Sequence, residues 1–175
     1  MSHSQEARTP PLLVVMGVSG SGKSTIGAAL AQRLRVPFAD ADDFHPAANI
    51  AKMSAGHPLN DEDRGPWLDA VGEWLAAHPD GAVMSCSALR RDYRDRLRHH
   101  AARLEFIHLA GSREVIAARM AGRPGHFMPA SLLDSQFATL EPLGADEAGV
   151  TIDIDQSVDD VVQQYVDQLT EEQHS

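Results

Sequence analysis

Short apolar runs alternate along the chain with longer segments whose apolar residues follow helical spacing. Leu12–Met16 is a continuous apolar run, typical of a parallel strand that is covered on both faces. From Lys23 to Leu34, apolar residues recur every three or four positions, which predicts a helix packed on one face. Further strands are predicted at about 36–39, 82–86, 104–109 and 150–154. Further helices are predicted at about 46–53, 66–78, 89–100, 112–121, 130–140 and from 157 onward.

Alternating strands and helices predict an α/β fold of three layers, with a parallel sheet of about five strands between helices. A chain of 175 residues suits one domain, and ligands of such sheets bind at the carboxyl edge of the strands. The segment 122–129, "GRPGHFMP", interrupts the pattern with two Gly and two Pro, so a mobile lid is expected at 122–130. The polar ends, 1–10 and 171–175, are expected to be frayed.

Charge and composition narrow the function classes. The chain has 15 basic and 25 acidic residues, a net charge of −10, which argues against nucleic-acid binding. Cys86 is the only cysteine, so an internal disulfide is excluded and a small buried residue is expected. No apolar stretch reaches the 18 or so residues of a membrane span, and no signal peptide is recognisable, so a cytoplasmic enzyme is expected.

The strongest motif is "GVSGSGKST", which follows the first predicted strand and opens the first predicted helix. Gly17, Gly22, Lys23 and Ser24 match the pattern G-x-x-x-x-G-K-[ST] of a P-loop. Backbone N–H groups and the helix N-terminus would bind phosphate, Lys23 would reach the β- and γ-phosphates, and Ser24 would contact Mg²⁺. The motif predicts nucleotide binding, but does not separate a kinase from a GTPase, an ATPase or a nucleotide-dependent sensor.

The surroundings of this motif favour a kinase. No N-K-x-D guanine-reading tetrad occurs, and Ser85-Cys86-Ser87 stands where many ATPases place a magnesium-side Asp. Asp40 and Asp42 in "DADDF" point to the same side of an extended strand end, so one could serve the water shell of magnesium and the other the acceptor hydroxyl. The alternative is that these carboxylates only solvate a turn and cap the helix containing Pro46.

The region 44–78 is rich in directional hydrogen-bonding groups and is expected to bind a polyhydroxylated acceptor. Its candidate residues are His45, Asn49, Lys52, His57, Asn60, Asp61, Asp63 and Arg64. On the helix after the third strand, Arg90, Arg94 and Arg98 recur every four residues and could clamp a carboxylate. Pairing with Asp92 and Asp95 along the same helix places Arg96 and Arg98 on a solvated face. Arg90 and Arg94 are therefore the better candidates.

The predicted lid carries cations of its own. Arg119 and Arg123 lie on either side of its start, and a lid arginine that closes on the γ-phosphate would neutralise charge during phosphoryl transfer. Each could also be only a cation at a helix C-terminus. His126 is singled out by its place in the lid, and the nine histidines show no H-x-x-x-H spacing for zinc.

Seven motifs in order, from Val15 to about Asp155, resemble the gluconokinases, small P-loop kinases of the shikimate-kinase and nucleoside-monophosphate-kinase type. They are "MGVSGSGKST", "DADDFHP", "N-x-x-K-M", "G-x-PLND-x-DR-x-PW", "CSALRR-x-YRD", "GHFMP" and "QF-x-TLEP". The resemblance implies transfer of the γ-phosphoryl group of ATP to the 6-hydroxyl of D-gluconate, with Mg²⁺ and a homodimer. A shikimate or nucleotide kinase and a non-catalytic ATP-dependent sensor remain alternatives.

The resemblance also implies roles for individual residues. Lys23, Asp42 and Arg123 would be catalytic, and Asp42 would orient the acceptor hydroxyl or accept its proton. Asp40 would support the metal through water, together with Ser24. The ATP site would comprise Gly17, Ser19, Gly20, Ser21, Gly22, Lys23, Ser24, Thr25 and Arg119. The acceptor site would comprise Asp42, His45, Lys52, Asp63, Arg64, Arg90, Arg94 and His126. The frequent Lys after "CSAL" in this family is Arg90 here, which leaves the role of that position open.

Overall fold

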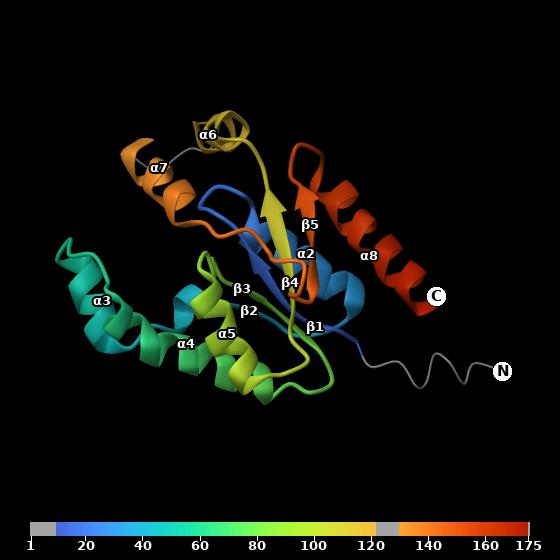
Figure 1. The fold of residues 1–175 in the computed structure, drawn as a ribbon, viewed down its shortest axis with the longest axis horizontal. Coiled ribbons are helices and arrows are strands. Elements are labelled where there is room, and N and C mark those ends of the chain that lie inside the picture. The colour runs from blue at the N-terminus through green and yellow to red at the C-terminus, as the bar shows by residue number, and fades with distance from the viewer. Residues whose placement is uncertain (1–9, 122–129, 175) are drawn as a thin grey trace.

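A computed structural model describes residues 10–121 and 130–174, and its centre is one parallel sheet (Figure 1). The sheet has five strands in the order β2-β3-β1-β4-β5. The strands are β1 (Leu12–Met16), β2 (Phe38–Asp40), β3 (Ala82–Ser85), β4 (Glu105–Ala110) and β5 (Gly149–Asp153). The predicted parallel sheet of about five strands is therefore confirmed. β1 lies in the middle, so the loop that follows it opens at the centre of the carboxyl edge.

Helices cover both faces of the sheet, which gives the predicted three layers (Figure 1). They are α2 (Lys23–Leu34), α3 (Ala47–Ser54), α4 (Asp61–Ala76), α5 (Arg91–His100), α6 (Arg113–Ala121), α7 (Ala130–Thr139) and α8 (Val158–His174), with a short 3-10 helix, η1 (Ala41–Phe44). Leu13 and Val15 of β1 pack toward α2 and α8. Leu12 and Val14 pack toward α4 and α5 on the other face.

All five residues of β1 are buried, which explains why its sequence is apolar without alternation. Neighbouring side chains of a strand point to opposite faces, and here each face carries a helical layer. Full burial of each such aliphatic side chain contributes roughly 1.5–3 kcal/mol. The core on both sides of β1 therefore gives the loop after it a rigid base.

The predicted start of the α4 helix near residue 66 is wrong, because α4 begins at Asp61 and contains Pro66. The helix starts at a capping box, in which Asn60 accepts the backbone N–H of Asp63 and Asp63 accepts the backbone N–H of Asn60. Pro66 suggested a first helical turn because it lacks an N–H group. The capping box starts the helix more than one turn before Pro66, and the helix tolerates the proline within its second turn.

The other predicted elements agree with the structure within a few residues at their ends. The expected strand 36–39 is β2, shifted toward Asp40, and the expected helix 89–100 begins at Arg91. Most of the expected lid, with Arg123 and His126, and residues 1–9 of the first polar end lie outside the described residues. The second polar end, expected to be frayed, is described up to residue 174, where it forms the last turn of α8 (Val158–His174). Among the described helices, none is long and apolar enough to cross a membrane.

Candidate active site

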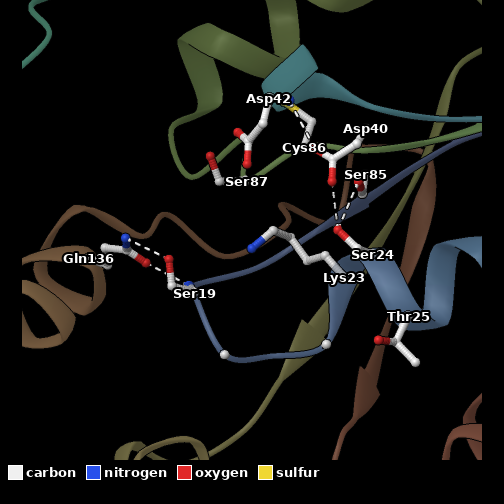
Figure 2. Close-up of a pocket in the computed structure, with 12 residues that line it drawn as sticks. Ser19, Lys23, Ser24, Thr25, Asp40, Asp42, Ser85, Cys86, Ser87 and Gln136 are labelled. Carbon is white, nitrogen blue, oxygen red and sulfur yellow. Dashed lines mark hydrogen bonds between the residues drawn. The ribbon is translucent and has the colours of Figure 1, made fainter. Parts of the chain in front are cut away.

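The loop between β1 and α2 borders a pocket of about 340 Å³ at the carboxyl edge of the sheet (Figure 2). The pocket is lined by Ser19, Gly20, Gly22, Lys23, Ser24, Thr25, Asp40, Asp42, Ser85, Cys86, Ser87 and Gln136. Gly22 is the N-cap of α2 and has φ 90°, a left-handed conformation that a side chain disfavours. The loop therefore turns sharply into α2 and directs the helix N-terminus, which attracts anions, at the pocket.

Lys23 places its ammonium group inside this pocket. Its Nζ donates a hydrogen bond to the carbonyl oxygen of Val18 at 3.1 Å, so the side chain folds back over the loop. Burial lowers the pKa of Lys23, while Asp42 and Asp40 act in the opposite direction. Burial also raises the pKa of the Cys86 thiol to about 12, so this thiol stays protonated, and the prediction that Cys86 is buried is confirmed.

Asp40 links the end of β2 to the loop. Its Oδ2 accepts the hydroxyl of Ser24 at 2.8 Å, and its Oδ1 accepts the backbone N–H of Asp42 at 2.9 Å. The capping alternative is therefore partly correct, because Asp40 is the N-cap of η1 rather than of the helix containing Pro46. Ser24 also lies 3.5 Å from the hydroxyl of Ser85, which places three side-chain oxygens at one end of the pocket.

Asp42 faces the ammonium of Lys23 across the pocket and lies next to Ser87 (Figure 2). Partial burial raises the pKa of Asp42, and the negative charge of Asp40 raises it further. His45 and Lys23 act in the opposite direction. A carboxylate with a raised pKa is a stronger base, so Asp42 is suited to accept a proton.

His45 follows η1, the short helix that contains Asp42, and contacts one residue of α3 and one of α4. Its ring stacks on Trp67 with 4.5 Å between the ring centres, and the Asn49 amide lies 3.2 Å from its Nδ1. Partial burial lowers the pKa of His45, which favours the neutral ring. Trp67 in turn donates to the carbonyl of Ala41 at 2.7 Å, which joins α4 to η1. These contacts fix the segment that carries Asp42.

Lys52 and Asp63, two predicted acceptor ligands, contact each other at 2.6 Å and do not line the described pocket. Asp63 also caps α4, and its pKa is lowered, chiefly by the hydrogen bond from Lys52. Arg64 is half-buried and donates to the hydroxyl of Tyr93 at 3.2 Å. These residues therefore form a hydrogen-bonded cluster beside the pocket, and their contact with an acceptor stays a prediction.

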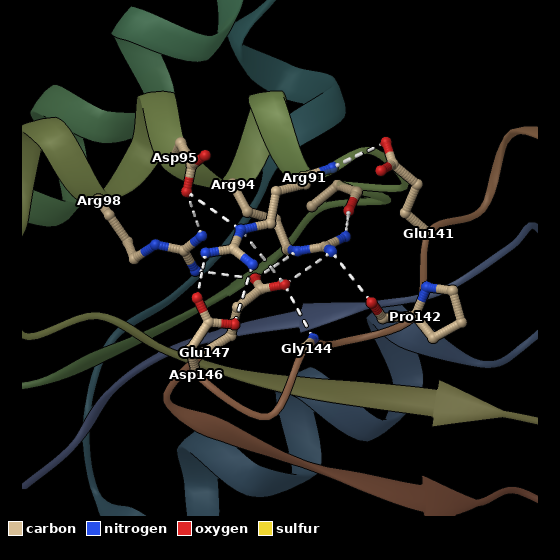
Figure 3. A network of polar contacts seen from close by, with 10 residues as sticks. Arg91, Arg94, Asp95, Arg98, Glu141, Pro142, Gly144, Asp146 and Glu147 are labelled. Atoms are coloured by element: carbon tan, nitrogen blue, oxygen red, sulfur yellow. Dashed lines mark hydrogen bonds and ion pairs between the residues drawn. The ribbon is translucent and has the colours of Figure 1, made fainter.

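Arg90 and Arg94 have different surroundings, although they lie one helical turn apart. The Arg90 side chain is 41% exposed, and its guanidinium lies 5.7 Å from the centre of the Tyr93 ring. The Arg94 side chain is 0% exposed and binds Glu147 through Nε at 2.7 Å and Nη2 at 3.0 Å (Figure 3). The structure thus contradicts the expectation that Arg94 is open to a substrate carboxylate. Spacing on the helix could not reveal Glu147, a partner 53 residues away.

Several pocket residues were not among the predicted site residues. Gln136 of α7 contacts Ser19 through both amide atoms, while Ser85, Cys86 and Ser87 line the pocket at the end of β3. The only sequence signal for Gln136 was its place in the motif "QF-x-TLEP". Three predicted ATP-site residues do not line the described pocket: Gly17, Ser21, which is fully buried, and Arg119.

Arg119, the predicted adenine-side residue, donates to the backbone carbonyls of Ile154 and Gln156 in the segment after β5. This contact joins the end of α6 to the beginning of the connection to α8. Arg119 lies in the last turn of α6, which agrees with the alternative of a cation at a helix C-terminus, and its guanidinium anchors this helix to the segment after β5. Contact of Arg119 with adenine stays a prediction.

The fold and the pocket together define a small P-loop kinase of the shikimate kinase type. The family model described as shikimate kinase matches residues 19–170. A shikimate kinase from Acinetobacter baumannii, solved with shikimate, has the same fold with a TM-score of 0.67 and 20% identity over 97% of this chain and 98% of that chain.

Much closer similarity is found to the gluconokinases. A gluconokinase from Gluconobacter oxydans is 48% identical over 90% of each chain, and a thermoresistant gluconokinase from Escherichia coli is 46% identical over 86% of this chain and 89% of its own. The crystal structure of a gluconokinase from Sinorhizobium meliloti has a TM-score of 0.86 and 48% identity over 95% of each chain. The chain belongs to the gluconokinase family of ATP-dependent kinases, and the resemblance seen in its motifs is confirmed.

Proposed function

We propose that this protein transfers the γ-phosphoryl group of ATP to the 6-hydroxyl of D-gluconate, giving 6-phospho-D-gluconate and ADP. The main support for this proposal is that Asp42 lines the same pocket as Lys23 and the phosphate-binding loop. Family membership and the names of the relatives support gluconate as the acceptor. The dense polar cluster from His45 to Arg64, beside the pocket, also suits a ligand with several hydroxyl groups.

In this reaction the protein mainly aligns groups and neutralises charge. The loop amides and the N-terminus of α2 bind the phosphates, and Lys23 reaches the β- and γ-phosphates. Asp42 orients the acceptor hydroxyl and receives its proton as the oxygen attacks the γ-phosphorus. The raised pKa of Asp42 strengthens its hydrogen bond to that hydroxyl, because a more basic carboxylate holds a shared proton more tightly.

Ser24 and Asp40 fit the needs of a magnesium ion. Mg²⁺ prefers oxygen ligands and binds proteins through one or two such groups while keeping waters and phosphate oxygens. The Ser24 hydroxyl and the Asp40 carboxylate are 2.8 Å apart and exposed to the pocket. When bound, the ion would neutralise negative charge on the β- and γ-phosphates. The groups expected to hold it are Ser24 directly and Asp40 through water.

Arg90 is the proposed partner of the gluconate carboxylate. Its guanidinium is exposed and its ion pairs are long, at 3.8 Å to Asp92 and 4.0 Å to Glu141. Arg64 lies 5.7 Å from the same Tyr93 ring, so two guanidinium groups flank one aromatic side chain. An arginine fork binds a carboxylate through two parallel hydrogen bonds, which Arg90 can form without breaking a buried pair.

Three further features rest on the family resemblance alone. Closure of a lid with Arg123 and His126 over the reactants, contact of Arg119 with adenine, and assembly into a homodimer are all part of the proposal. A lid arginine near the γ-phosphate would stabilise the charge of the transition state.

The decisive measurement is ADP release with gluconate, shikimate, AMP or no acceptor. We expect a rate that depends on gluconate alone, and phosphorus–proton correlation by NMR should place the product phosphate on C6. ADP release at the same rate without gluconate would refute the proposal. Release only with shikimate or AMP would assign another kinase, and no release with any acceptor would favour a nucleotide-dependent sensor.

The acceptor site is tested by Arg90→Gln at the N-cap of α5, with Arg96→Gln within α5 as the matched control. Arg96 forms an exposed pair with Asp69. Loss of one charge-assisted fork should raise the KM for gluconate by about 10- to 100-fold. The KM for ATP should change less than about twofold, and the control should resemble the wild type. Equal gluconate KM values in all three proteins would remove Arg90 from the site.

A further inference from the structure

Two side chains hold opposite ends of one peptide group in the phosphate-binding loop. The Ser19 N–H donates to Oε1 of Gln136 at 2.6 Å, and the Val18 carbonyl accepts Nζ of Lys23 at 3.1 Å. These two groups belong to the same planar peptide unit, in which the N–H and the carbonyl point in opposite directions. The Ser21 N–H also donates to the Val18 carbonyl, at 3.2 Å. The contact of Gln136 on one side of the peptide therefore acts with this bond to fix where the acceptor for Lys23 points on the other side.

Gln136 makes a second contact that fixes its own orientation. Its Nε2 donates to the Ser19 hydroxyl at 3.0 Å, so both amide atoms contact Ser19 (Figure 2). A side chain held at two atoms has less freedom than one held at a single atom, so the direction of Oε1 is well defined. This paired contact joins α7 to a loop residue 117 positions earlier in the chain.

Helix α7 is a firm support for this contact. Leu133 of α7 is 3% exposed and Phe137 packs against the same core cluster as β1 and α2. After α7, the backbone N–H of Glu141 donates to the carbonyl of Leu89 at 2.7 Å. Gln136 thus extends from a helix anchored on both the core and the segment before α5, and it reaches the pocket wall.

We propose that Gln136 is a positioning residue for Lys23. By holding the Val18–Ser19 peptide with its carbonyl toward the ammonium, Gln136 places the Lys23 charge in the pocket and so sets the affinity for the β- and γ-phosphates. Without Gln136 the peptide keeps only the bonds to its carbonyl, from Lys23 and from the Ser21 N–H at 3.2 Å, and the Ser19 N–H loses its acceptor. The peptide is then freer to tilt, and the carbonyl no longer holds the ammonium in one place. The inference rests on the proposed role of Lys23 in ATP binding and deepens it.

The test compares Gln136→Met, which keeps side-chain length and removes the amide, with Gln163→Met. Gln163 is an exposed glutamine of α8 that contacts Arg33 and Asp167 and lies outside the pocket. Equilibrium binding of ATP, ADP and AMP is measured without acceptor. Loss of hydrogen bonds that orient a charged group should weaken ATP and ADP binding by about tenfold. AMP binding should change less than about twofold, because AMP lacks the phosphates that Lys23 reaches. The control should match the wild type.

A double-mutant cycle with Lys23→Met separates positioning from direct contact. If Gln136 acts through Lys23, Gln136→Met should change ATP affinity less than about twofold in the Lys23→Met background. A tenfold loss in both backgrounds would make Gln136 a direct ligand and overturn the proposal. Unchanged ATP affinity in the single variant, or an equal loss for AMP, would also overturn it.

Two further measurements separate a positioning role of Gln136 from misfolding of the variant and from a role in acceptor binding. If Gln136→Met does not fold by circular dichroism, the same cycle is run with Gln136→Asn, which is one methylene too short to reach Ser19. The KM for gluconate should stay within about twofold of the wild-type value, and an isolated rise in that KM would assign Gln136 to the acceptor instead. Because nucleotide binding needs no acceptor, a protein that ignores gluconate would refute the proposed acceptor and leave the Gln136 result intact.

Discussion

Glu147→Gln tests the polar network that joins α5 to the segment before β5 (Figure 3). The Glu147 side chain is 0% exposed and accepts hydrogen bonds from Arg94 at 2.7 and 3.0 Å and from Arg98 at 3.0 Å. The backbone N–H of Gly144 adds a bond at 3.0 Å. The substitution keeps the shape of the side chain but leaves the buried guanidinium of Arg94 without its carboxylate.

The expected loss follows from two independent arguments. Burial raises the pKa of Glu147, but the hydrogen bonds from Arg94, Gly144 and Arg98 outweigh burial and bring the pKa to about 2 from an ordinary 4.5. At 1.36 kcal/mol per pKa unit, this shift corresponds to about 3 kcal/mol. Removing one partner of a buried ion pair costs about 3–5 kcal/mol in other proteins. The two arguments agree.

The assay is urea unfolding at pH 7, followed by circular dichroism. With a urea dependence of roughly 1–3 kcal/mol per M, a loss of about 3 kcal/mol should lower the midpoint by about 1–3 M. Asp146→Asn is the matched control, because Asp146 is the neighbouring residue, forms a similar two-bond pair with Arg91, and is 68% exposed. An exposed pair contributes about 0–1 kcal/mol, so the control midpoint should hardly move.

The loss of stability in Glu147→Gln should depend on pH, and the direction follows from the lowered pKa of Glu147. A lowered carboxyl pKa stabilises the fold above the unfolded pKa near 4.5, and this stability is lost as the pH falls toward 2. The difference between wild type and Glu147→Gln should therefore shrink as the pH drops from about 5 to 3. A loss for Glu147→Gln as small as that for Asp146→Asn, or a difference that grows in acid, would refute the reasoning.

Three other substitutions test the site and its supports. Asp42→Asn should lower kcat by about 100-fold or more with nearly normal ATP affinity. Because a raised carboxyl pKa disfavours the ionised form in the fold, the same variant should unfold at the same or a higher temperature at pH 7, and turnover near the wild-type value would move the proton acceptor elsewhere. Gly149→Ala should lose about 3 kcal/mol in urea unfolding, because φ is +149° and a Cβ would lie 2.1 Å from the carbonyl oxygen of Phe106; wild-type stability would contradict this. Trp67→Phe should lose about 1–3 kcal/mol in the same assay by leaving the Ala41 carbonyl without its 2.7 Å donor, and no loss would mean that this bond is unimportant.

The sequence by itself determined the fold class and the phosphate-binding site. Both depend on local patterns: an apolar run for a doubly covered strand, helical spacing after it, and "GVSGSGKST" between them. Asp40 and Asp42 were also found from sequence, because they lie at the end of a strand and just after it, and that strand must end at the same sheet edge as the loop. Seven motifs in order were enough for the family.

Only the tertiary structure decided which polar residues belong to the pocket and which stabilise the fold. Arg90 and Arg94 are equivalent in helical spacing, yet Arg94 is buried in an ion pair with Glu147 and Arg90 is exposed. Gln136 stands in the motif "QF-x-TLEP", but the motif could not reveal its contact with Ser19, which lies 117 positions earlier in the chain. Side-chain pairs far apart in sequence depend on how the helices pack on the sheet. Local propensity carries no information on such pairs, so the network around the pocket could be read only from the folded chain.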